Sequence, residues 1–494
     1  MAETQVLERR RWIALGLLCT AQFMVILDAS IVNVALPSIG KDLNFSQENL
    51  PWVVNAYVLT FGGFLLLGGR MADLLGRRRV FISGLLVFAA ASLVGGFAQT
   101  EAWLIAARAV QGLGAAFLSP AALSIVTTTF RDGAERNKAL GVWGAVAGSG
   151  GAVGVLLGGI LTDGLGWQWV LFVNFPIGIA AAALAPLLLA ESRRETKTRR
   201  FDVAGAVSVT AGLSILVYAL VDANSAGWGS TRTIGLLALS VALLLAFVAI
   251  ELRAKEPLVP FSFLENRTRA GANIVGLLVG ASLFSMFFFI SLYMQQVLGY
   301  SALKAGFAYL PLAVTIILSA GIASQLVTKI GFKPVLATGL ASIAAGLIWF
   351  SQISVGGSFL GDILGPSLLA AVGLGFSFVP VTIAALSGTD ETDAGLGSGL
   401  INTAQQIGGA LGLAILAAVA TARTSDVLSS SQGPPEPLNA LTEGFQAAFL
   451  TGAGFALLGL VLTFVLIRSS DSRAHQEIGS DVKAAAATEA SEIW

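Results

Sequence analysis

The sequence has few charged residues, one cysteine and one histidine. Of its 494 residues, 12% are charged and 55% are hydrophobic. This balance excludes an ordinary soluble domain, because a surface facing water needs more polar side chains. The lone Cys19 and lone His475 leave no disulfide framework and no cysteine or histidine metal cluster. No Gly-x-x-x-x-Gly-Lys-Ser/Thr phosphate loop occurs, so the sequence does not predict ATP-driven pumping. We therefore expect no cofactor and no metal.

The chain is rich in long apolar runs. Fourteen runs of roughly 16 residues or more lie between charged or turn-rich breaks, and about 20 mostly apolar residues are needed to cross a bilayer core. The sequence thus predicts an all-α polytopic membrane protein with 14 spanning helices. Segment 421–444, which is rich in Ser, Pro and Thr, is predicted to be an outer loop.

The basic residues predict the orientation of the chain. With the N-terminus in the cytoplasm, 24 of the 29 Lys and Arg residues fall on the inner side, as expected for a multi-pass cell-membrane protein with both termini cytoplasmic. The formal net charge is zero, so no nucleic-acid partner is expected. The inner loop 387–395 departs from the pattern, because it has no base and carries Asp390, Glu391 and Asp393.

Two halves of the chain resemble each other. An offset of 255 residues aligns 44–46 with 299–301 and 76–78 with 331–333. Internal repeats are the usual build of secondary transporters, whose two bundles alternate access to a central site. The predicted domains are a first six-helix bundle (12–190), a charged linker with two inserted helices (191–251), a second six-helix bundle (271–467) and a disordered cytoplasmic tail (469–494).

Two charged residues, Asp28 and Arg108, lie well inside predicted spans. A charge at that depth costs about 2.5–3.5 kcal/mol on insertion scales, which makes each a functional candidate. Asp28 lies about 12 Å and Arg108 about 9 Å from the outer ends of their helices, so the two side chains can meet. Either they form a static ion pair, or Asp28 carries a proton whose affinity changes as Arg108 or substrate moves. His475 is a poor proton carrier, because it lies in the predicted tail.

Four segments resemble motifs of the major facilitator superfamily, in particular its fourteen-helix drug:proton antiporters. Residues 27–37 read LDASIVNVALP and resemble the family's helix 1 motif. Residues 69–79 read GRMADLLGRRR and resemble the signature of the loop between helices 2 and 3. Residues 108–114 read RAVQGLG and resemble the helix 4 motif linked to proton transfer. Residues 150–159 read GGAVGVLLGG and resemble the antiporter motif, with Val155 where the motif has proline.

The resemblance implies a function. We expect a secondary active exporter of small lipophilic or weakly cationic compounds, such as drugs and antibiotics, coupled to proton influx. A translocase of lipid or hydrophobic metabolite with the same fold is the alternative. An intramembrane enzyme is not expected, because one Asp and one Arg without a nucleophile or metal make no catalytic set. The expected partners are a small-molecule substrate, protons and the bilayer, and the expected state is a monomer.

Two further groups of residues are candidates for function. Polar and aromatic residues on the predicted spans are candidates for lining a substrate cavity: Gln22, Asn33, Asn55, Tyr57, Gln111, Phe287, Tyr293, Gln295, Asn402 and Gln405. The acidic inner loop and the bases after helix 2 are predicted to form a cytoplasmic gate, made of Gly69, Asp73, Gly76, Arg77, Arg78, Asp390 and Asp393. The family resemblance places Asp73 near the start of the thirteenth predicted span, 396–420, where a helix N-terminus favours a carboxylate.

Overall fold

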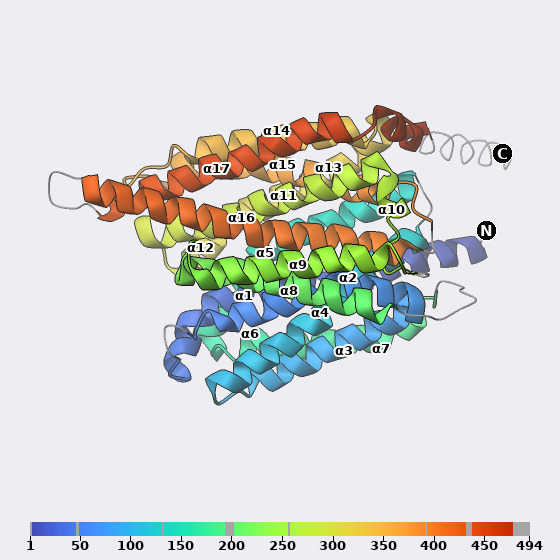
Figure 1. Ribbon diagram of the computed structural model, residues 1–494, viewed down its shortest axis with the longest axis horizontal. Coiled ribbons are helices and arrows are strands. Elements are labelled where there is room, and N and C mark those ends of the chain that lie inside the picture. Colours follow the sequence, from blue (N-terminus) through green and yellow to red (C-terminus); the bar gives the residue numbers. More distant parts are fainter. Residues whose placement is uncertain are drawn as a thin grey trace. The chain divides into compact units, whose positions relative to one another are not determined.

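The computed structural model is built from helices (Figure 1). Thirteen of its helices are long and apolar enough to cross a membrane, and counting the bent pair Ala134–Gly151 and Val153–Leu165 as one span brings the number to fourteen. The described residues contain no strand, so the predicted all-α membrane fold is confirmed. The structure describes residues 2–45, 49–130, 133–192, 202–254, 257–390, 393–430 and 437–477.

The chain divides into two compact units. The first unit comprises Met1–Thr129, Gly150–Leu264 and Thr389–Thr403, and the second comprises Phe130–Ser149, Glu265–Gly388 and Ala404–Trp494. These units cut the chain differently from the predicted domains. The two predicted inserted helices belong to the first unit, and two long helices each contribute one part to either unit.

The first unit is built from the early helices. Its elements are α1 (Ala2–Asp42), α2 (Trp52–Leu75), α3 (Arg77–Gly96), α4 (Glu101–Thr129), the later part of α5 (Ala134–Leu165), α6 (Trp169–Phe172), α7 (Asn174–Leu188), α8 (Val203–Ala226), α9 (Thr231–Glu251), most of α10 (Ser262–Glu265) and the start of α16 (Ala394–Ser430). α4 packs mainly against α2 and α3. This packing places the polar side chains of α4 among apolar helices.

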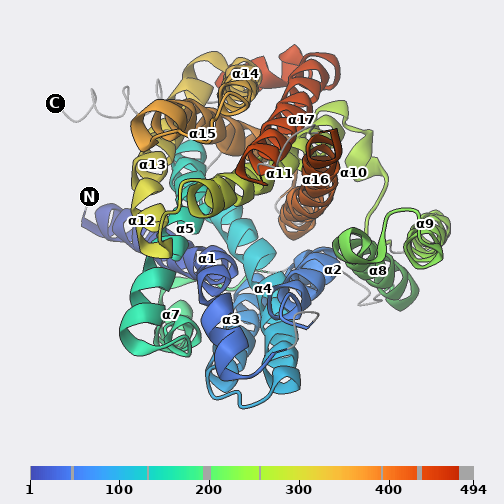
Figure 2. The same cartoon turned by 90° about the vertical axis from the view of Figure 1, so that its left-hand side faces the viewer.

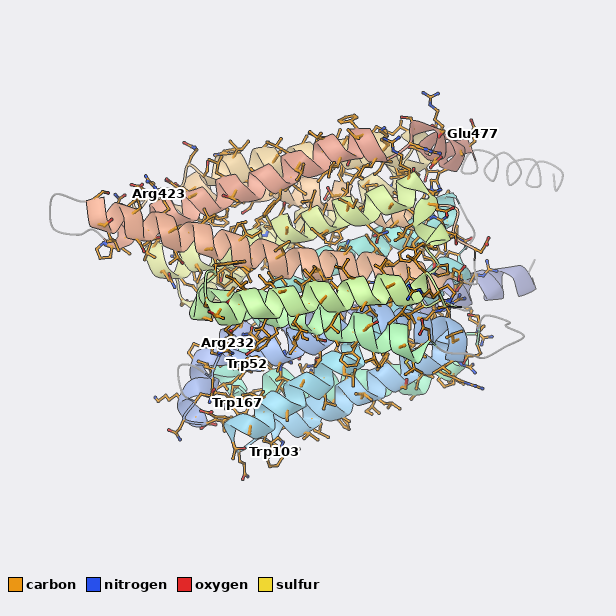
Figure 3. All side chains as sticks on the ribbon, in the orientation of Figure 1. Trp52, Trp103, Trp167, Arg232, Arg423 and Glu477 are labelled. Atoms are coloured by element: carbon orange, nitrogen blue, oxygen red, sulfur yellow. The ribbon has the colours of Figure 1, made fainter. Side chains whose placement is uncertain are left out.

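The inserted helices α8 and α9 lie side by side (Figure 2). α8 packs closely on α2, because a Cβ on Gly63 of α2 would lie 2.0 Å from Ser214 Oγ. Trp52, at the start of α2, stacks on Tyr218, in the later part of α8, with ring centroids 5.5 Å apart. Arg232 lies at the same end as Trp52 (Figure 3) and pairs with Asp222 at 3.1 Å. α8 is therefore fixed along α2 at two levels.

The second unit contains the later helices. Its elements are the first part of α5, α11 (Arg267–Leu292), η1 (Tyr293–Val297), α12 (Ala302–Ala308), α13 (Leu310–Ile330), α14 (Phe332–Phe350), η2 (Phe359–Leu364), α15 (Gly365–Ala385), the later part of α16 and α17 (Pro437–Leu466). η1 and η2 are single π-helical turns that continue into or from longer helices. α14 packs against both α15 and α17.

The predicted outer loop 421–444 is wrong over most of its length. α16 continues to Ser430, and α17 begins at Pro437. Arg423, which Figure 3 labels on this helix pair, donates to Asp426 at 3.0 Å and to Glu443 at 2.6 Å. Ion pairs of this kind support helix outside the apolar region, where hydropathy gives no signal.

The predicted disordered tail is also wrong at its start, because residues 469–477 are helical. This segment is held by polar contacts at buried side chains. His475 Nε2 lies 3.0 Å from Asn137 Oδ1, and Lys333 N donates to Ser472 Oγ at 3.1 Å. A polar composition therefore did not prevent docking, because each buried polar group found a partner. Residues 478–494 lie outside the described part of the chain.

Candidate functional site

Asp28 of α1 and Arg108 of α4 form an ion pair in the first unit. Arg108 Nη1 lies 2.5 Å from Asp28 Oδ2, and the two side chains are 1% and 0% exposed, respectively. The structure thus joins the two embedded charges that the sequence singled out. A buried pair of this kind is costly to break, because each charge would be left without a partner away from water.

Neutral side chains complete the coordination of Asp28. Its Oδ1 accepts hydrogen bonds from Gln111 Nε2 at 2.8 Å and from Asn174 Nδ2 at 2.9 Å. Both amides also donate to Ser92 Oγ, which itself donates to Leu171 O at 2.8 Å. Asp28 is therefore held by donors from α4 and α7, with α3 supporting them.

Arg108 is held as tightly as Asp28. Its Nε donates to Val53 O at 3.0 Å, and its Nη1 also donates to Gln111 Oε1 at 2.7 Å. The Tyr57 ring lies 4.5 Å from the guanidinium carbon, in cation–π contact. Nη2 is buried, and no described residue accepts a hydrogen bond from it.

The oxygens of Asp28 act only as acceptors in this arrangement. Every group that contacts them is a donor, and both ends of the Gln111 amide are already engaged. A protonated carboxyl carries a hydrogen that needs an acceptor. None of the side chains that contact Asp28 offers one without moving or rotating.

A second cluster joins the end of α2 to the start of α16, also within the first unit. Asp73 accepts from Gly395 N and Leu396 N, each at 2.9 Å. Its side chain is 0% exposed, and a helix N-terminus stabilises a carboxylate through its free N–H groups and dipole. A Cβ on Gly69 would lie 2.5 Å from Gly395 O, so only glycine permits this approach. The expected place of Asp73 and the need for Gly69 agree with this geometry.

The basic residues after α2 contact Asp73 and Glu191, whereas the predicted cytoplasmic gate pairs them with Asp390 and Asp393. Arg77 Nη2 donates to Asp73 Oδ1 at 3.0 Å. Arg78 and Arg79 pair with Glu191, at 3.8 and 3.6 Å. Gly76, at φ 108°, forms the turn between α2 and α3. Arg77 and Arg78 follow this turn directly, and the turn faces the chain that leaves α7.

The acidic loop before α16 reaches α2 through a different base. Asp393 Oδ1 lies 3.6 Å from Arg70 Nη1. Asp390 is exposed, and Glu391 lies outside the described residues. The acidic loop thus contacts α2 through Asp393 and Arg70, and a gate pairing Asp390 or Asp393 with Arg77 or Arg78 stays a prediction.

Six cavity candidates lie in the first unit. Tyr57 and Gln111 belong to the Arg108 network and are almost fully buried, and a role for them in lining a cavity stays a prediction. Gln22 is 6% exposed and its Oε1 has no partner among the described residues. The other three are at least partly exposed: Asn33, Asn55 and Asn402.

Four cavity candidates lie in the second unit. Tyr293 is 1% exposed and donates to Ser354 O at 2.7 Å, so it ties two segments together. Phe287 stacks on Tyr309 with centroids 5.6 Å apart. Gln295 is exposed, and Gln405 is half-buried with its Nε2 unpartnered among the described residues.

Sequence reasoning missed Asn174 and Ser92. Both are neutral and lie in apolar runs, where such residues more often join helices than serve a site. One signal was present, since Asn174 is the one asparagine in the predicted span 167–190. Its partners depend on the fold, because Asn174 is 146 residues from Asp28.

Comparison with known proteins gives the family. The Major Facilitator Superfamily model matches residues 18–413. The puromycin resistance protein pur8 of Streptomyces alboniger is 39% identical over 475 residues, which cover 95% of this chain and 94% of that protein. The cephamycin export protein CmcT of Amycolatopsis lactamdurans is 43% identical over 456 residues, 92% of each chain.

A solved structure shows the same fold. The human organic anion transporter MFSD10 matches with a TM-score of 0.62 at 15% identity, covering 92% of this chain and 99% of that one. The family model, the two relatives and this fold agree over nearly the whole length. The chain therefore belongs to the major facilitator superfamily and is a multi-pass membrane transporter of small molecules.

Proposed function

We propose that this transporter exports small lipophilic or weakly cationic compounds, including antibiotics, in exchange for protons. The observation that carries the proposal is the buried Asp28 carboxylate, held by Arg108 and two side-chain amides. The names of the two relatives, which refer to puromycin resistance and cephamycin export, support export of antibiotic-like compounds. Antiport would follow if a given conformation of the protein binds either a proton or a substrate, but not both.

The proton step would use the donor contacts of Asp28. These contacts join α1, α4 and α7. A proton on Asp28 would remove the charge that Arg108 neutralises and release at least one amide donor. The helices could then rearrange, because the free energy of proton binding offsets the free energy lost when their contacts break. Asp28 would be the proton carrier and Arg108 the residue that sets when the proton leaves.

The proposed orientation places both termini and the cluster around Asp73 in the cytoplasm of a cell-membrane protein. The excess of Lys and Arg on that side supports it. Asp73, Arg77, Arg70 and Asp393 would then hold the cytoplasmic side closed, and alternating access would require the start of α16 to leave α2. The six-helix bundles predicted from the internal repeat would be the moving parts.

Replacing Asp73 tests the gate. Asp73→Asn keeps one acceptor for two N–H groups and removes the charge beside the buried Arg77, so we expect a loss of about 1.5–3 kcal/mol from charge-assisted hydrogen bonds. That is about 10- to 150-fold in the opening equilibrium. The measurement is maleimide labelling of Ser398→Cys, at a side chain that is 0% exposed, in a Cys19→Ser background.

The matched control is Asp390→Asn, which changes the same charge at an exposed position and is expected to label at the parent rate. Equal labelling of Asp73→Asn and its parent would contradict the gate.

Transport assays on the parent protein test the function itself. Inside-out vesicles carrying the protein should accumulate ethidium or puromycin when their interior is acidified, and accumulation should stop when an ionophore dissipates the pH gradient. A broader compound panel would define the substrate range. Transport that ignores the pH gradient would overturn proton coupling, and uptake of labelled lipid without uptake of either compound would favour the lipid translocase.

A further inference from the structure

The inserted helices α8 and α9 have no part in the proposed proton or gate chemistry, yet α9 ends in a buried acid. Glu251 is 3% exposed. Its carboxylate accepts from Leu258 N at 3.2 Å and from Val259 N at 2.9 Å. Leu258 and Val259 are themselves buried, at 2% and 3% exposed. Two hydrogen bonds therefore fasten the chain that leaves α9 back onto the end of that helix.

The same short segment also contacts α2. Arg70 Nη2 donates to Pro257 O at 3.1 Å, and its Nη1 lies 3.6 Å from Asp393 Oδ1. Arg70 is 6% exposed, and these two contacts join it to Pro257 and to Asp393, the residue before α16. Segment 257–259 is thus a bridge, held by Glu251 on one side and in contact with the gate residue Arg70 on the other.

The start of α8 closes around the same acid. Asp202 Oδ1 caps α8 by accepting from Gly205 N at 2.8 Å. A Cβ on Gly205 would lie 2.5 Å from Asp202 Oδ2 and 2.5 Å from Glu251 Oε1. Both carboxyl groups therefore converge over Gly205, and a side chain there would displace Glu251, Asp202 or both.

The rest of α8 gives this arrangement a fixed base. α8 is packed on α2 at Gly63 with Ser214, and at Trp52 with Tyr218. The segment held by Glu251 is therefore placed relative to the same helix that carries Arg70. A change at Glu251 shifts the bridge without touching Arg70 or Asp393 directly.

We infer that the inserted helix pair controls the cytoplasmic gate: Glu251 fixes segment 257–259, this segment orients Arg70, and Arg70 holds Asp393 ahead of α16. The inference rests on the proposed function in that the gate must open during transport. Glu251 is a positioning residue, since it contacts neither substrate nor the gate acid. The inserted helices α8 and α9 would then hinder opening of the cytoplasmic gate.

The test is labelling of Ser398→Cys in the Cys19→Ser background, with and without Glu251→Gln. The amide keeps the size of the side chain, but it presents donors where the segment presents N–H groups. We expect labelling to rise about 2- to 30-fold, the range for couplings that act through a neighbouring residue. In an Asp393→Asn background, Glu251→Gln should add nothing, because the pair through which it acts is already broken.

Gly205→Ala provides a second route to the same change, with Gly235→Ala on α9 as the matched control. A Cβ on Gly235 meets nothing within 4 Å. Gly205→Ala should raise labelling as Glu251→Gln does, while Gly235→Ala should match the parent. Parent-like labelling of both test variants, or an effect of Glu251→Gln that persists with Asp393→Asn, would overturn the inference. Labelling requires neither substrate nor protons, so failure here leaves the proposed role of Asp28 to be judged by transport alone.

Discussion

Asp28→Asn is expected to reduce efflux driven by a pH gradient to the rate of vesicles without the protein. The amide keeps the shape of the side chain and keeps an acceptor for Arg108, but it cannot take up or release a proton. Folding and membrane insertion should persist, because no cavity is created and Arg108 keeps an acceptor, while the new amide group replaces the acceptor for Gln111 and Asn174. Exchange of substrate across the membrane without a gradient should also persist. The measurement is ethidium accumulation in inside-out vesicles after acidification.

Asp163→Asn is the control for that experiment, since Asp163 is an exposed aspartate on α5. It should transport like the parent. If Asp28→Asn also accumulates ethidium at the parent rate, Asp28 and Arg108 are a static pair and the coupling residue lies elsewhere.

Arg108→Ala is expected to uncouple transport from the pH gradient more than it destabilises the fold. Removing one partner of a buried pair costs about 3–5 kcal/mol when the other charge stays buried. Asp28 can avoid that cost by keeping a proton throughout the cycle. We therefore expect gradient-driven accumulation to fall to background, with a loss of unfolding free energy well below that range.

The double variant Asp28→Asn with Arg108→Ala separates the two roles of Arg108. If Arg108 acts through the proton on Asp28, the double variant should transport no worse than Asp28→Asn, and its thermal unfolding should lie close to that of Arg108→Ala. A static pair predicts the reverse pattern: Arg108→Ala unfolds at a much lower temperature, and removing the now unpaired charge in the double variant restores stability.

The sequence predicted the residues whose chemistry is rare in a membrane. Asp28 and Arg108 were identified because an isolated charge at that depth is costly, and the structure then joined them. Asn174 was missed because a neutral amide in a glycine-rich or alanine-rich helix is common. Its importance depends on a contact between α1 and α7 that only the fold supplies.

The cytoplasmic gate shows a second limit of prediction from the sequence. The sequence placed three acids opposite several bases but did not say which would pair. Asp73 lies in the last turn of α2 and Arg77 begins α3, with the Gly76 turn between them, so this turn brings their side chains together and Arg77 is already engaged. Arg70 and Glu251 lie at the ends of helices, where hydropathy patterns are weakest, and each contacts a backbone carbonyl or amide that no side-chain pattern reveals.

Proton release on substrate binding tests the central claim most directly. Purified protein in weakly buffered detergent solution, at a pH where the parent binds ethidium, should acidify the medium when ethidium is added, because substrate stabilises the arrangement that excludes a proton from Asp28. Asp28→Asn should bind ethidium without any such release. Equal proton release from the parent and from Asp28→Asn would contradict the account.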